Sequence, residues 1–123
     1  MPVTRQRFED LVFACAEALL AELPPHLRAE AATVLLEVAD QPTPEQDPEG
    51  AGLLGLYEGV PLVERRPDDV FFQPDRITLF YRPLLEMAGT EAQLRREIRV
   101  TLVHELGHFF GFDEDELEQR GWG

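Results

Sequence analysis

The feature that most constrains the fold is a long helix near the carboxyl end of the chain. Thr90 and Gln93 have the spacing of a capping box, in which the Thr hydroxyl accepts a hydrogen bond from the backbone N–H of Gln93. Gly111 follows the last residue of the helical pattern and suits a left-handed C-cap. These two signals predict one helix over Glu91–Phe110, against which the rest of a small chain must pack.

The apolar surface of this predicted helix widens along its length. In the first half, three arginines mark a solvent-facing side. In the second half the same side carries Val103, Leu106 and Phe110, so the helix becomes apolar almost all round, which predicts burial. The polar side chains of that half are confined to one sector: Thr101, His104, Glu105 and His108.

The two histidines of this sector are spaced as a pair of metal ligands. His104 and His108 lie one helical turn apart on the same face, where two imidazoles can share one metal ion. The Glu105 carboxylate stands beside them and can hydrogen-bond a water molecule on the metal. Burying these three side chains without partners would cost several kcal/mol. The pattern therefore favours a zinc site over a metal-free hydrogen-bond network.

A tetrahedral catalytic zinc site needs a third protein ligand and leaves its fourth position to water. Gly111 allows the chain to reverse, which would bring Asp113, Glu114 or Asp115 back toward the metal. The acidic run that contains these residues could equally be a solvated surface. The residues by themselves leave the third ligand open.

The remaining elements are an amino-terminal helix and a few short strands. Apolar residues at three- and four-residue steps predict a helix over 4–23, with Thr4 as its N-cap. The apolar, β-branched run 33–39 predicts a central strand. Segment 53–57 suits an edge strand or a tight apolar turn, and segment 76–81 alternates well enough for a further strand.

Composition excludes several classes of function. A chain of 123 residues has room for one core, so we expect residues 1–123 to form a single domain. Serine, lysine and asparagine are absent, which excludes a serine nucleophile and a lysine Schiff base. A net charge of −13 repels phosphate backbones and anionic lipids, so neither nucleic acid nor membrane is an expected partner. With no long apolar stretch and no signal peptide, we expect a cytoplasmic protein.

The motif resembles a known signature when it is extended. His104-Glu-x-x-His108-x-x-Gly111-x-x-Glu114 resembles the extended zincin signature, and the chain is similar to the small bacterial mini-zincin family of metallopeptidases. The similarity also covers segments 53–62 and 74–79 and the Gly121-Trp122 pair. It implies a minimal zincin-like α+β fold, with a small mixed β-sheet packed on an N-terminal helix and on the active-site helix.

The resemblance also implies roles for the residues of the motif. His104 and His108 are then zinc ligands, Glu105 is the general base and Glu114 is the third ligand. The related aspartate-type signature has Asp at that last position, so Asp113 is the alternative to Glu114. The resemblance thus implies a zinc-dependent metallopeptidase that acts on a peptide or protein, with Glu105 as general base beside zinc-activated water.

The resemblance also bears on how a substrate would bind. An edge strand would hold the extended peptide by β-augmentation. Only fifteen residues follow His108, so we expect substrate binding either to be weak or to need a protein partner that completes the cleft. Tyr57, Tyr81 and His26 are candidates for stabilising the oxyanion. The alternative function is a zinc-binding module that presents its edge strand to a peptide or protein partner without catalysis.

Overall fold

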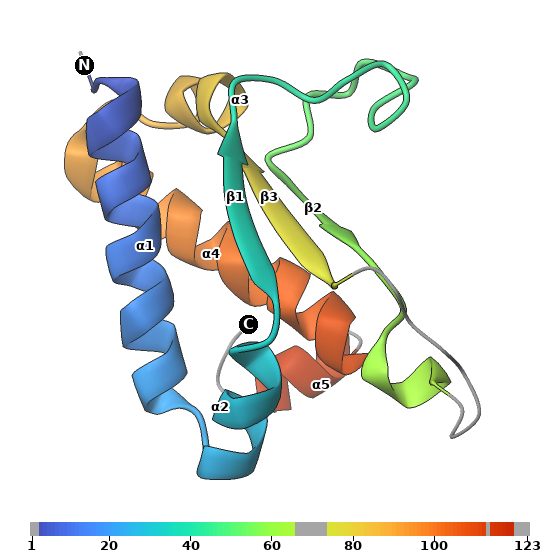
Figure 1. Ribbon diagram of the computed structural model, residues 1–123. Coiled ribbons are helices and arrows are strands. Elements are labelled where there is room, and N and C mark those ends of the chain that lie inside the picture. The colour runs from blue at the N-terminus through green and yellow to red at the C-terminus, as the bar shows by residue number, and fades with distance from the viewer. Residues whose placement is uncertain (1–2, 66–73, 113, 120–123) are drawn as a thin grey trace.

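The computed structural model describes residues 3–65, 74–112 and 114–119, and it has the expected α+β fold (Figure 1). Its strands form one mixed sheet: β1 (Leu35–Ala39), β2 (Gly55–Glu58) and β3 (Arg76–Phe80). Its helices are α1 (Arg5–Glu22), α2 (Pro25–Ala31), α3 (Tyr81–Glu86), α4 (Glu91–Phe110) and α5 (Glu114–Gln119), with one 3-10 turn, η1 (Leu62–Glu64). No helix in these ranges is both long enough and apolar enough to cross a membrane.

The sheet has the strand order β1-β3-β2, and this order corrects one prediction. β1 pairs with β3 in parallel, and β2 pairs with β3 antiparallel. Residues 77–80 of β3 are buried, whereas Leu35 of β1 is 43% exposed. The prediction that 33–39 forms the central strand is therefore wrong. An apolar run shows that a segment packs against a core, but which strand lies in the middle depends on pairing with distant segments.

Helix α4 is the element on which the others pack. Figure 1 shows it crossing behind the sheet, with α1 running beside it on the side of β1. Leu94, Ile98 and Leu102 line its buried face and share one core with residues of α1 and β3. At the surface, the two terminal guanidinium nitrogens of Arg99 donate to the carboxylate of Glu22 in α1, at 2.9 and 3.0 Å. These contacts hold α4 in place along most of its length, and none of them involves a residue of the motif.

The caps of α4 are those that the sequence predicts. The Thr90 hydroxyl accepts from the backbone N–H of Gln93 at 3.1 Å. The Gln93 side chain reaches back one residue further than in the usual capping box and accepts from the N–H of Gly89. At the other end Gly111 is left-handed, with φ 81° and ψ 24°. The helix begins and ends where these signals place it, and this fixes which side chains share a turn.

Candidate metal centre

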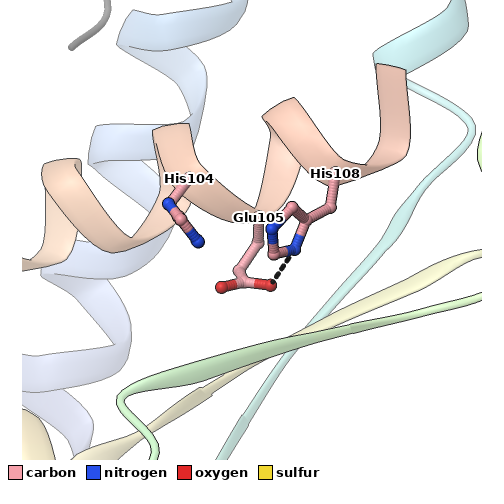
Figure 2. A group of neighbouring side chains, drawn as sticks. All are labelled: His104, Glu105 and His108. Atoms are coloured by element: carbon pink, nitrogen blue, oxygen red, sulfur yellow. Dashed lines mark hydrogen bonds and ion pairs between the residues drawn. The ribbon is translucent and has the colours of Figure 1, made fainter. Parts of the chain in front are cut away.

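Three of the predicted site residues come together on one side of α4. Figure 2 shows His104, Glu105 and His108 pointing to the same side of the helix, and their potential donor atoms lie within 4.8 Å of one another. The two imidazole centroids are 4.5 Å apart and the ring planes cross at 69°. The two rings meet edge to face rather than stacked.

The second half of α4 is buried almost all round, as expected, and the three side chains of the motif differ in burial within it. Glu105 is 7% exposed, and His104 is partly buried. His108 keeps 49% of its side chain exposed, and Val100, two turns earlier on the helix, is also exposed. The two imidazoles thus lie at the boundary between the buried and the exposed sides of α4. That boundary leaves the imidazoles accessible while the carboxylate is shielded.

A hydrogen bond within the motif sets the roles of the ring nitrogens of His108. Its Nδ1 lies 3.2 Å from Oε1 of Glu105, the contact drawn in Figure 2. An ionised carboxylate can only accept, so with Glu105 ionised the ring would donate from Nδ1. The lone pair of Nε2 would then be available to a metal, and the carboxylate would orient the ring as a second-shell partner does in metal sites.

This group of side chains fits a zinc ion. Zinc binds imidazole nitrogen at about 2.0–2.1 Å, so two ligand atoms of one tetrahedral ion lie roughly 3–4 Å apart. Donor atoms that already lie within 4.8 Å reach that spacing by small side-chain rotations. The buried Glu105 carboxylate would also gain a positive neighbour. His104 and His108 could therefore hold a divalent zinc.

The chain turns sharply after the motif, as a third ligand requires. The N–H of Gly111 donates to the carbonyl of His108 at 3.1 Å, and that of Phe112 donates to the carbonyl of Gly107 at 2.8 Å. This closes the helix and allows α5 to begin at Glu114. Asp113 and the side chain of Glu114 lie outside the described residues, and Asp115 is exposed. Glu114 as third ligand, with Asp113 as its alternative, stays a prediction.

The turn at Gly111 should be sensitive to a side chain. A Cβ there would lie 2.4 Å from Cγ2 of Val63, and φ is already in the left-handed region. Gly111→Ala is therefore expected to lower the free energy of unfolding by about 2 kcal/mol, measured by urea denaturation without metal. Gly111→Ala with Val63→Ala should recover the steric part only. If the single variant is as stable as the parent, Gly111 does not hold this turn.

Strand β2 runs beside the part of α4 that carries the motif. Gly55 approaches α4 so closely that a Cβ on it would meet the side chain of Thr101. Two residues further along β2, the Tyr57 ring packs edge-on against Phe109, with centroids 6.0 Å apart. The three site residues fall between these two contacts along the helix. The stretch from Gly55 to Tyr57 therefore runs alongside the part of α4 that carries the candidate metal centre.

The backbone of that stretch is directed outward at alternate residues. The N–H of Phe80 donates to the carbonyl of Leu54 at 3.0 Å, which makes this a hydrogen-bonded pair of the antiparallel ladder. With a period of two, Leu56 is the next residue that bonds to β3. The N–H and C=O groups of Gly55 and Tyr57 then point away from β3, along the outer edge of the sheet. These are the groups with which an edge strand can bind another strand.

A polar network at the end of β2 was not predicted. The Tyr57 hydroxyl donates to one carboxylate oxygen of Asp75 at 2.7 Å, and Arg65 pairs with the other oxygen. The Arg65 guanidinium also lies 5.7 Å above the Phe109 ring. Burial, followed by the hydrogen bond to Asp75, raises the pKa of Tyr57. The network ties β2 to the start of β3, and its members are too far apart in sequence for a local pattern to reveal it.

This network also bears on the candidates for an oxyanion donor. The Tyr57 hydroxyl donates a hydrogen bond to the Asp75 carboxylate, and the Tyr81 hydroxyl donates one to the backbone carbonyl of Val3. His26 lies on α2 and is exposed. Both tyrosine hydroxyls are thus engaged within the protein. A role for any of the three in the reaction therefore stays a prediction.

Comparison with known proteins identifies the family. A family model described as zincin-like metallopeptidase matches residues 31–122, which run from the end of α2 through the sheet, α4 and α5. No curated protein matches the chain. The matched range is most of the chain, and it contains both the His104–His108 motif and the β2 edge. The chain therefore belongs to the zincin-like metallopeptidase family.

Proposed function

We propose that this protein is a zinc-dependent peptidase. The observation that carries the proposal is the convergence of His104, Glu105 and His108 beside an outward-facing strand edge, in a chain of the zincin-like family. His104 and His108 would hold the metal, with Glu114 as the third ligand. When bound, zinc supplies Lewis-acid polarisation of a carbonyl and lowers the pKa of water.

Glu105 is the residue suited to move protons in this site. It lies between the two histidines in sequence, and its carboxylate is held in place by the contact with His108. As general base it would accept a proton from the attacking water, and it would then return that proton to the leaving amine. Its burial supports this role, because a shielded carboxylate has few competing water contacts.

The outer edge of β2 would hold the substrate. An extended peptide can pair with the outward-facing backbone groups of Gly55 and Tyr57, as in other cases of β-augmentation. Backbone pairing of this kind is tolerant of side-chain identity, so it suits a peptide or an unfolded protein segment. It also sets the peptide parallel to the part of α4 that carries the motif.

Removing the metal is the direct test. We expect the purified protein to hold about one zinc per chain and to digest fluorogenic casein. A chelator such as 1,10-phenanthroline should abolish digestion, and one equivalent of zinc should restore it. Elemental analysis and the casein assay are run on the same sample. Bound zinc without any digestion would contradict the peptidase and would favour the alternative, a zinc-binding module that captures a peptide at β2 without cleaving it.

A further inference from the structure

Gly55 of β2 has no conformational reason to be a glycine. Among the described residues, the glycines with positive φ are Gly50, Gly52, Gly59 and Gly111. Gly55 instead lies in an ordinary extended strand, which any residue can adopt. A glycine in a strand also leaves that position without a side chain to pack. Its surroundings must therefore explain its presence.

Those surroundings leave no room for a single methyl group. A Cβ on Gly55 would lie 2.6 Å from Cγ2 of Thr101, 2.9 Å from Cδ2 of Leu79 and 3.3 Å from the carbonyl oxygen of Thr78. The Leu79 contact is with the end of a flexible side chain, which can rotate. The Thr101 contact cannot be relieved so easily, because the buried Thr101 hydroxyl donates to the carbonyl of Glu97 at 2.8 Å and thereby fixes its rotamer.

The contact between Gly55 and Thr101 lies close to the candidate metal centre. Thr101 lies one helical turn before Glu105 on α4, so the Gly55–Thr101 contact sets how closely β2 approaches the motif. Gly55 also carries outward-facing backbone groups at the edge of the sheet. The same residue therefore both touches the metal-bearing helix and offers hydrogen bonds to a peptide.

We infer that Gly55 is a positioning residue, whose missing side chain sets the distance between the peptide-binding edge of β2 and the Glu105 carboxylate. This inference rests on the proposed peptidase function. A methyl group at position 55 falls about 1 Å short of ordinary van der Waals separation from Thr101, so β2 would have to move outward by a similar amount. A displacement of that size costs up to about 100-fold in rate when a substrate is misplaced.

The test measures binding apart from turnover. Zinc-loaded Glu105→Gln protein is titrated with a fluorescein-labelled casein peptide, and binding is followed by fluorescence anisotropy. Adding Gly55→Ala is expected to weaken peptide binding at least about tenfold with unchanged zinc content. The melting temperature should fall by several degrees, because the added methyl group overpacks the contact with Thr101, but the protein stays folded at the assay temperature. Adding Thr101→Ser as well removes the obstructing Cγ2 but keeps the hydroxyl, and should bring the affinity back to within about threefold of the parent. Gly89→Ala, at the distant start of α4, is the matched glycine control.

Steady-state kinetics in the background with Glu105 intact adds a second readout. Gly55→Ala is expected to raise KM and lower kcat, whereas simple loss of folded protein would lower kcat alone. The inference is overturned if Gly55→Ala binds the peptide like the parent, if Thr101→Ser fails to rescue it, or if the Glu105→Gln parent binds no peptide. Peptide binding with the expected rescue, but without hydrolysis by the wild-type protein, would overturn only the peptidase function.

Discussion

Glu105→Gln is expected to reduce peptide hydrolysis by about 10²–10⁴-fold while zinc stays bound. Glutamine keeps the shape of the side chain and can still contact His108, but it cannot accept the proton of water. The histidines that would hold zinc are unchanged. The variant should therefore lose casein digestion but keep about one zinc per chain.

Glu97→Gln is the matched control for this result. Glu97 lies two turns before Glu105 on the same helix and is partly buried, so the substitution makes the same chemical change outside the motif. Its expected digestion rate is within about twofold of the parent, because it leaves the site residues in place. Turnover by a zinc-loaded Glu105→Gln protein at the rate of this control would refute the assignment of Glu105 as general base.

His104→Ala is expected to weaken zinc binding by more than about 100-fold, since even the loss of a second-shell partner costs 10–100-fold in metal affinity. One imidazole and a carboxylate cannot provide the nitrogen-rich set that zinc prefers. His104 is only partly buried, so the helix should survive the change. Competition with a chromophoric chelator gives the affinity, and circular dichroism reports the helix content.

The comparison for His104 is a histidine outside the motif. His26→Ala removes an exposed imidazole from α2, and it should leave the zinc affinity at the value of the parent. The two variants change the same atoms at different places, so nonspecific binding of zinc to surface histidines would lower both affinities alike. Equal zinc affinity in the two variants would exclude His104 as a ligand.

The sequence predicts α4 and its motif well because the information there is local. Thr90 and Gln93 are three residues apart, and Gly111 directly follows the last helical residue, so each cap depends only on near neighbours. The spacing of His104 and His108 then determines that they share a face. The convergence of the three site residues is a consequence of helix geometry, which needs no knowledge of the rest of the fold.

Several features that depend on distant pairing were not predicted. β1 was expected in the centre of the sheet because its composition is apolar, but β3 pairs on both sides and takes that place. The ion pair of Arg65 with Asp75, and the approach of Gly55 to Thr101, join residues that no periodic pattern connects. The exposure of His108 likewise depends on where the other elements stop covering α4. Such contacts are properties of the assembled core rather than of any segment.

The shared position of β3 also has a consequence for how the chain folds. Arg76 of β3 pairs with Glu58 and with Leu35, which precede it by 18 and 41 positions. β1 and β2 do not pair with each other, so neither has a partner in the sheet before β3 is formed. Closing the shorter loop costs less chain entropy, so the β2–β3 hairpin should assemble first and β1 should dock onto it. The strand edge beside α4 would then be present in the folding nucleus, ahead of the opposite edge of the sheet.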